Sequence, residues 1–174
     1  MVAFNRQVNN CSKVDWGVLI NGSMSLYCDE NILIKDLDWL KDNQYKAIIL
    51  DFSEILSCEE FHARIKKTCE FPDYYGKNMS ALSDCLLHDL EIPYEGGCVF
   101  VLKNFDLFYM KDKEMAHDIL ERLSEASRQR MLTGERLITL LQSRNPKFVP
   151  DTIGAYKIPW NRHEFIEASR IKAR

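Results

Sequence analysis

Apolar residues along the chain follow two spacings, one typical of helices and the other of buried strands. Leu33, Leu37 and Leu40 recur every three or four residues, so the pattern predicts a helix over residues 31–43. A short, unbroken apolar run follows directly and predicts a buried strand over residues 46–52. The chain therefore alternates between the two kinds of element from an early point, which favours an α/β fold.

The next apolar positions predict a helix over residues 58–69. Ser57 and Glu60 have the spacing of a capping box, in which the two side chains accept hydrogen bonds from backbone N–H groups at the helix start. Apolar residues then repeat every four positions up to Cys69, so one face of this helix is expected to be buried.

A second helix is predicted over residues 79–88. Its apolar stripe, which we expect to face the core, consists of Ala81, Leu82, Cys85 and Leu86. The positions outside this stripe, which we expect to face outward, are Ser80, Ser83, Asp84 and Leu87. This helix is therefore expected to carry hydroxyl and carboxylate groups on the protein surface.

The second half of the chain continues the alternation. Residues 98–102 and 136–141 predict two more buried strands, and residues 112–131 predict a long helix between them. Gly134 lies just beyond this helix, where glycine commonly forms the C-terminal cap. From residue 46 onward the order is strand, helix, helix, strand, helix, strand, which favours a parallel sheet with right-handed crossovers.

Both ends of the chain add elements to this core. The turn-forming pair Asn21-Gly22 lies between two short apolar runs within residues 14–28, which predicts a β-hairpin. An irregular, proline-containing stretch near the other end leads to Asn161 and Glu164, whose spacing predicts the start of a final helix.

The connection between residues 69 and 79 holds two adjacent tyrosines. Pro72 disfavours helical geometry, and Gly76 is expected to adopt a positive φ angle, so this segment is predicted to be a loop. Asn78 is expected to cap the helix that follows. We expect Tyr74 to be exposed and Tyr75 to be at least partly packed. Because exposed tyrosines are enriched among interface hot spots, the loop indicates a protein-binding surface.

Length, hydrophobic content and charge distribution add to these predictions. At 174 residues and 46% hydrophobic content, the chain is long and apolar enough for one domain with a buried core. The net charge of −3 is unevenly distributed, because residues 71–95 hold five acidic side chains and one lysine, a local charge of −4. An acidic segment disfavours nucleic acid as a direct partner and favours a basic protein.

The six cysteines show no C-x-x-C spacing, so no zinc or redox motif is indicated. The N-terminus has no apolar signal core, and no apolar run is long enough to span a membrane. We therefore expect a cytoplasmic protein whose cysteines are reduced and mostly buried.

Enzyme chemistry has weak support in the sequence. The common nucleotide-binding, zinc-protease and hydrolase motifs are absent. Asp84 and His88 lie four residues apart on one predicted helix, a spacing that can bind a metal ion or position a general base. Such pairs are also common on solvated helix faces, so the enzyme hypothesis stays open only as an alternative.

Two neighbouring sequence patterns stand out in the middle of the chain. They are Phe61-His62-Ala63-Arg64-Ile65-Lys66-Lys67 and Pro72-Asp73-Tyr74-Tyr75-Gly76-Lys77-Asn78, followed by Ala81-Leu82 and Asp84-Cys85-Leu86. This combination resembles the barstar family of intracellular inhibitors of bacterial ribonucleases, and the resemblance covers about residues 47–142. It implies a three-layer α/β fold, with a small parallel sheet flanked by helices, in agreement with the predicted order of elements.

The resemblance also implies an organisation in three parts. Residues 46–142 would form the barstar-like domain. Residues 1–45 would be an N-terminal extension, a hairpin plus a helix packed on the core, and residues 143–174 a C-terminal extension with a helix.

The function that the resemblance implies is inhibition by plugging. The tyrosine loop and the helix after it would enter the active-site groove of a ribonuclease, and carboxylates would satisfy the cations that normally hold phosphate. The implied partner-binding residues are Tyr74, Gly76, Asn78, Ser80, Ser83, Asp84, Leu87, His88 and Glu125. No cofactor, metal ion, direct nucleic acid or membrane contact is expected, and the protein would be a monomer that forms a 1:1 complex.

Several positions depart from the family pattern. Ser80 and Ser83 stand where barstar has an aspartate and a tryptophan, Asp89 stands where it has another tryptophan, and Gln129 stands near the position where it has a glutamate. These differences favour a target other than barnase, such as the ribonuclease toxin of a bacterial competition system, with this chain as its immunity protein. The alternative is a barstar-fold adaptor that binds a protein other than a nuclease.

Overall fold

The computed structural model describes residues 10–172. Its elements in chain order are α1 (Val14–Leu19), β1 (Met24–Tyr27), α2 (Glu30–Asp42), β2 (Tyr45–Asp51), α3 (Cys58–Cys69), α4 (Met79–His88), β3 (Gly97–Lys103), α5 (Phe105–Lys111), α6 (Lys113–Leu132), β4 (Leu137–Gln142) and α7 (Glu167–Lys172). The predicted α/β class is confirmed, and no described helix is long and apolar enough to cross a membrane.

The four strands form one parallel sheet in the order β1-β4-β3-β2. The predicted parallel arrangement of β2, β3 and β4 is therefore confirmed. The central strands β3 and β4 are buried along almost their whole length, as expected for parallel strands covered by helices on both faces.

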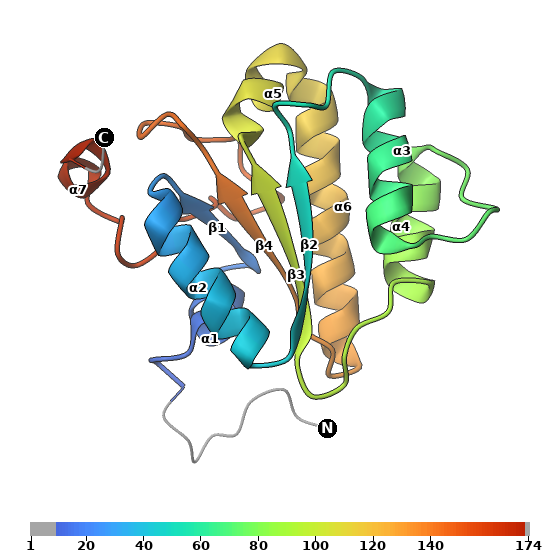
Figure 1. The fold of residues 1–174 in the computed structure, drawn as a ribbon, viewed down its shortest axis with the longest axis horizontal. Coiled ribbons are helices and arrows are strands. Elements are labelled where there is room, and N and C mark those ends of the chain that lie inside the picture. Colours follow the sequence, from blue (N-terminus) through green and yellow to red (C-terminus); the bar gives the residue numbers. More distant parts are fainter. Residues whose placement is uncertain (1–9, 173–174) are drawn as a thin grey trace.

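Helices cover both faces of the sheet, which makes three layers (Figure 1). Val99 and Val101 of β3 point into an apolar cluster shared with α1 and α2, whereas Phe100 and Leu102 point into the larger cluster shared with α3, α4, α5 and α6. Successive strand side chains point to opposite faces, so one strand supplies both cores. The three-layer arrangement implied by the resemblance is present.

The predicted hairpin within residues 14–28 is wrong. Its first half is helix α1, in which Val14 and Val18 are buried one helical turn apart. Its second half is β1, which pairs in parallel with β4 rather than with a preceding strand. The Asn21-Gly22 turn therefore joins a helix to a strand, and the spacing of four between the buried valines was the better local signal.

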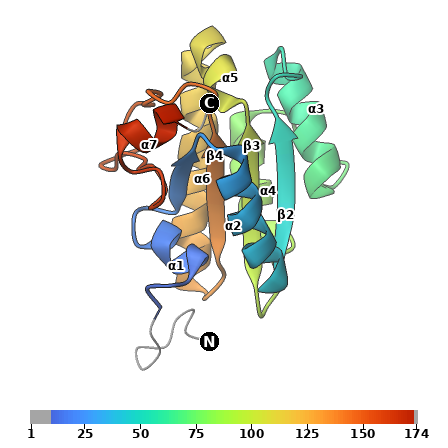
Figure 2. The same ribbon diagram turned by 60° about the vertical axis from the view of Figure 1, so that its left-hand side comes forward.

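The predicted start of the last helix at Asn161 is also wrong, because α7 begins at Glu167. Asn161 instead lies beside β1, where its backbone N–H donates to the carbonyl of Leu26 at 2.9 Å. Leu26 in turn donates to the carbonyl of Pro159 at 2.8 Å. The segment before α7 therefore covers the outer edge of β1 (Figure 2), which leaves that strand no open edge there.

Other local predictions fared better. Gly134 has a φ of 86° and directly follows Thr133, the C-cap residue of α6, so its predicted capping role is confirmed. Helix α5 was not predicted, although Phe105 and Phe108 bury their rings in the core.

Among the cysteines, only Cys69, Cys85 and Cys98 are buried, so the expectation of mostly buried cysteines is wrong for half of them.

Candidate partner-binding surface

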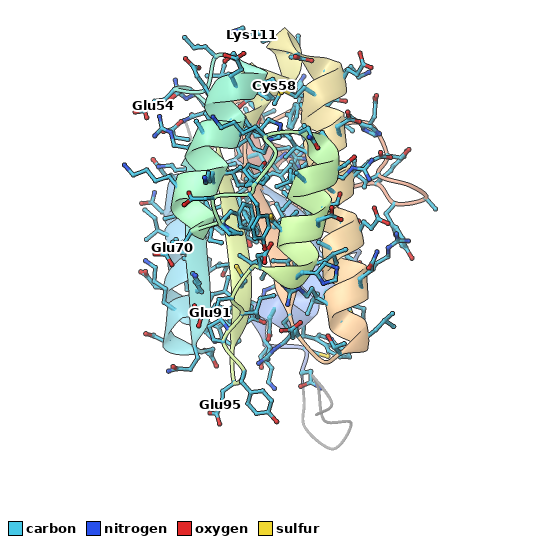
Figure 3. All side chains as sticks on the ribbon, turned by 90° about the vertical axis from the view of Figure 1, so that its right-hand side faces the viewer. Glu54, Cys58, Glu70, Glu91, Glu95 and Lys111 are labelled. Atoms are coloured by element: carbon cyan, nitrogen blue, oxygen red, sulfur yellow. The ribbon has the colours of Figure 1, made fainter. Side chains whose placement is uncertain are left out.

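The predicted surface is built on two helices and the loop between them. Helices α3 and α4 lie side by side with α6 on one side of the molecule (Figure 3). The predicted capping box at the start of α3 is present in part: the Ser57 hydroxyl accepts a hydrogen bond from the N–H of Glu60 at 3.2 Å, but the Glu60 carboxylate accepts from the N–H of Leu56 and not from that of Ser57. Helix α3 ends at Cys69, and the next residue, Glu70, takes the left-handed conformation usually taken by glycine.

The inner side of the tyrosine loop is anchored in the core. Tyr75 is 4% exposed, and its ring lies 5.3 Å from that of Phe71, as measured between ring centroids. The Tyr75 hydroxyl and Nδ1 of His62 are hydrogen-bonded at 2.5 Å. His62 is buried on α3, its Nε2 has no hydrogen-bond partner, and burial lowers its pKa. The packing of Tyr75 is thus confirmed, and it relies on a neutral histidine.

The outer side of the loop carries Tyr74, which is 72% exposed, as predicted. Its hydroxyl donates to Oδ1 of Asp89 at 2.5 Å, just past the end of α4. The hydrogen bond to Asp89 raises the pKa of Tyr74 to about 12, and the same bond lowers the pKa of Asp89. The Tyr74 ring is therefore exposed yet held in place at its tip.

Gly76 does not have the positive φ angle that the sequence suggested, because Lys77 takes it instead, at 50°. A Cβ atom on Gly76 would lie 3.3 Å from Nδ2 of Asn78 and 3.4 Å from Cβ of Ala81. Glycine is therefore favoured there by the close approach of the loop to α4. Asn78 caps α4 as predicted, since its Oδ1 accepts from the N–H of Ala81 at 2.9 Å.

The outer face of α4 presents polar groups. Ser80, Asp84 and His88 are exposed and recur every four residues, which places them in one row along the helix. Ser83 and Leu87 are only half-buried, so the prediction that they face outward holds in part. Among the described residues, Asp84 has no hydrogen bond or ion pair, which leaves its carboxylate available to a partner.

Nothing in this row forms a metal site. Within residues 10–172 no group of three or more histidine, cysteine, aspartate or glutamate side chains is placed to hold a metal ion. Asp84 and His88 are solvent-exposed on the helix surface, and neither contacts a third titratable group in the hydrogen bonds and ion pairs of the described residues. The pair therefore has the features of a solvated helix face.

Helix α6 supports α4 from the side. The Arg130 guanidinium donates to the carbonyls of Leu86 and Leu90 at 3.0 and 2.9 Å, and it pairs with Glu135 at 2.9 Å. Glu125, which the resemblance added to the site, lies half-buried on α6 and pairs with Arg122 at 3.3 Å. Glu125 is thus already partnered, in contrast to Asp84.

Sequence reasoning missed three residues that shape this surface. Asp89, His62 and Arg130 fix Tyr74, Tyr75 and the end of α4 respectively. The contacts of Asp89 and His62 span 15 and 13 residues of chain, and those of Arg130 with the end of α4 span 44 and 40. No local spacing rule reports contacts over such separations.

Comparison with known proteins bears directly on this surface. Residues 45–142 match the family described as Barstar (barnase inhibitor). The chain belongs to the barstar family. A Bacillus subtilis (strain 168) protein named "Putative ribonuclease inhibitor YrdF" is 36% identical over 84 residues, which is 48% of this chain and 88% of that protein.

The barstar match covers β2 to β4 and with them the tyrosine loop, α4 and α6. It supports a role as a ribonuclease inhibitor, and it favours binding over catalysis. Helices α1, α2 and α7 and strand β1 lie outside the matched residues, so this chain adds a strand and a covering segment to the barstar sheet.

Proposed function

We propose that this protein inhibits a basic ribonuclease by inserting the tyrosine loop and the outer face of α4 into the enzyme's active site. The observation that carries the proposal is that Tyr74 on the loop and Ser80 and Asp84 on the outer face of α4 are all exposed. Tyr74 supplies an aromatic anchor, and Asp84 supplies a carboxylate that no described side chain neutralises.

Charge supports this choice of partner. A ribonuclease active site holds cations that bind phosphate, and removing them from water is costly unless an anion replaces the substrate. In the barnase–barstar complex, close charge pairs have measured coupling energies of about 1.5–7 kcal/mol, so a single well-placed carboxylate can dominate affinity. The local charge of −4 over residues 71–95 would also steer a basic enzyme toward this face.

The rigidity of the tyrosine loop also supports the proposed inhibitor function. Tyr74 is tethered to Asp89, Tyr75 is buried beside His62, and Asn78 caps α4. Binding therefore immobilises few additional side chains, and each one that is already fixed avoids an entropy cost of about 0.5–1.5 kcal/mol.

The target in this proposal is a ribonuclease toxin other than barnase. Ser80 and Ser83 replace larger family residues, and Asp89 binds Tyr74 where barstar has a tryptophan. The protein would act in the cytoplasm of a bacterium as an immunity protein, as a monomer in a 1:1 complex. Gly76, Asn78, Leu87, His88 and Glu125 would complete the contact area, with residues 46–142 as the inhibitor domain and residues 1–45 and 143–174 as its extensions.

The test is inhibition of the ribonuclease encoded beside this gene. Wild-type protein should suppress its RNA cleavage at a 1:1 ratio, and Tyr74→Ala with Asp84→Ala should weaken binding by about 100-fold or more. The matched control is Asp38→Ala, which removes an exposed carboxylate from α2 on the opposite face of the sheet and should bind like wild type.

Two results would contradict the proposal. Full affinity in the Tyr74 and Asp84 double variant would remove this face from the interface. Capture of a protein that cleaves no RNA, with no effect on any ribonuclease tested, would support the adaptor alternative. Calorimetry with the purified proteins measures both affinity and stoichiometry.

A further inference from the structure

Buried carboxylates provide a second point of interest, because ionised groups away from water require hydrogen-bond donors. Four are buried among the described residues: Asp15, Asp36, Asp106 and Glu164. In three of them both oxygens accept hydrogen bonds. The donors are Trp16, Tyr45 and Arg136 to Asp15, Arg144 and Asn145 to Asp106, and Cys28, Asp29 and Asn161 to Glu164.

Asp36 differs from the other three. It is 8% exposed and lies on the inner face of α2, between Leu33 and Leu37. Its Oδ2 accepts a hydrogen bond from the Tyr27 hydroxyl at 2.9 Å, whereas its Oδ1, which is not fully buried, accepts none from the described residues. Burial and the Asp36 carboxylate raise the pKa of Tyr27, so this hydroxyl remains a donor.

The open oxygen belongs to a residue that lines a pocket. This pocket, of about 430 Å³, is lined by residues of α1, β1, α2 and the segment before α7, among them Asp36, Tyr27 and Ser25. Figure 2 shows these elements gathered on one side of the molecule. Val14, Val18 and Trp160 supply apolar lining. An apolar pocket with one buried carboxylate has the usual composition of a ligand site.

Cationic side chains that line the pocket beside Asp36 limit the charge that a ligand can carry. Arg162 and Lys13 also line it. The Arg162 guanidinium donates to the carbonyl of Cys11 and to Nε2 of His163, so its hydrogen bonds go to groups other than Asp36. Both cations weaken the attraction of Asp36 for any cationic group and attract an anionic one, so a ligand that carries one cationic tip for Asp36 on an uncharged or anionic body fits these charges best.

We propose that this pocket binds an ammonium or guanidinium group, whose N–H donors hydrogen-bond to Oδ1 of Asp36 while the attached carbon chain contacts Val14, Val18 and Trp160. Two sources carry this chemistry: a small free amine or guanidine, and a lysine or arginine side chain of another protein. The pocket lies outside the barstar match, because it is built from residues 13–36 and 159–165.

The test compares n-butylguanidinium with n-butylurea, which has the same shape and no charge. Calorimetry on the full chain should show saturable binding of the cation at least about tenfold tighter than the urea, as expected for a charge-assisted hydrogen bond. The Trp160 indole signal in a ¹H–¹⁵N spectrum should move in the same titration. Absence of saturable binding, or equal binding of the two probes, would overturn the proposal without any variant.

Two variants locate the site. Asp36→Asn preserves an acceptor for Tyr27 and should weaken n-butylguanidinium binding by about tenfold or more, while the matched surface change Asp38→Asn should leave it unchanged. Gly17→Leu fills the α1 wall, where an added Cβ meets nothing within 4 Å, and should also reduce binding. Unchanged binding in either pocket variant, with a preserved spectrum, would overturn the assignment.

A capped Gly-Arg-Gly peptide and its citrulline counterpart distinguish the two sources. Selective binding of the arginine peptide supports a protein side chain as the ligand. Binding of n-butylguanidinium with exclusion of both peptides supports a small free molecule, since the pocket then admits the cation but not an attached backbone.

Discussion

Helices α2 and α4 cover opposite faces of the sheet and place their charges in opposite ways. The buried face of α4 is apolar, formed by Leu82, Cys85 and Leu86, and its carboxylate Asp84 points to solvent. The buried face of α2 includes the carboxylate of Asp36, next to a pocket. One helix therefore presents charge on an outer surface, and the other holds charge inside a concave site.

This difference determines how freely residues on the outer face of α4 and on the buried face of α2 can be substituted. Because the contacts of α4 with the core involve only its inner face, the outer residues can change with the partner while the helix stays in place. Ser80 and Ser83 illustrate such changes relative to barstar. On α2, Asp36 is buried and also lines the pocket, so a replacement there changes the pocket directly.

The largest expected difference in stability is between variants of two buried carboxylates. Both oxygens of Asp15 accept hydrogen bonds, whereas, among the described residues, only one oxygen of Asp36 does. Asp15→Asn removes the partner of Arg136 and should lower the free energy of unfolding by about 3–5 kcal/mol, as is usual for a broken buried ion pair. Asp36→Asn should cost less than about 1 kcal/mol, because Asp36 has one neutral donor. Urea denaturation measures both, and equal losses would show that the two carboxylates do not differ.

A similar contrast should separate the two faces of α4. Leu82→Ala empties a fully buried position and should cost about 2–5 kcal/mol. Asp84→Ala changes an exposed side chain and should alter stability by no more than about 0.5 kcal/mol. A large loss in the Asp84 variant, measured by the same denaturation, would mean that this residue supports the fold and is not simply displayed.

The pH dependence of the protein's stability tests the buried contact between His62 and Tyr75 on the inner side of the loop. Burial depresses the pKa of His62 below its ordinary value of 6.5, so the unfolded chain binds the proton more readily than the folded one. Stability should therefore fall as the pH drops below about 6.5, until the folded-state pKa of His62 is reached. Thermal unfolding between pH 8 and pH 5 measures this trend.

His62→Gln is the control for that experiment, because glutamine can hydrogen-bond to Tyr75 but does not titrate in this range. Its stability should depend less on pH across the same window. An identical slope in wild type and variant would assign the pH dependence to other groups.

The smallest effect concerns the outer side of the loop, where no change in stability is expected. Asp89→Ala removes the acceptor of the Tyr74 hydroxyl, so the pKa of Tyr74 should fall from about 12 toward the ordinary value of 10.0. Ultraviolet difference titration against the Tyr74→Phe variant isolates this group. An unchanged titration would show that Asp89 does not hold Tyr74 in solution.

Much of the fold followed from spacing alone. The predicted elements at residues 31–43, 46–52, 58–69 and 79–88 each match an observed element to within one residue or so, because the helices have a strong apolar period, the strand is one unbroken apolar run, and Ser57 and Asn78 mark two of the helix starts. The N-terminal hairpin failed because Asn21-Gly22 is a turn signal that does not specify which elements it joins. The start of the last helix failed because Asn161 and Glu164 bind the backbone at β1 and the start of α2 instead of capping a helix.

The sequence by itself determined the alternation of helices and strands, the parallel sheet, the exposure of Tyr74 and the burial of Tyr75, since these depend on local period and turn chemistry. The barstar pattern was likewise readable from a continuous stretch of residues. Only the tertiary structure decided that Asp89 holds Tyr74 and that Asp36 keeps an open oxygen beside a pocket. Those features depend on side chains from separate elements, whose distances are set by packing and not by spacing along the chain.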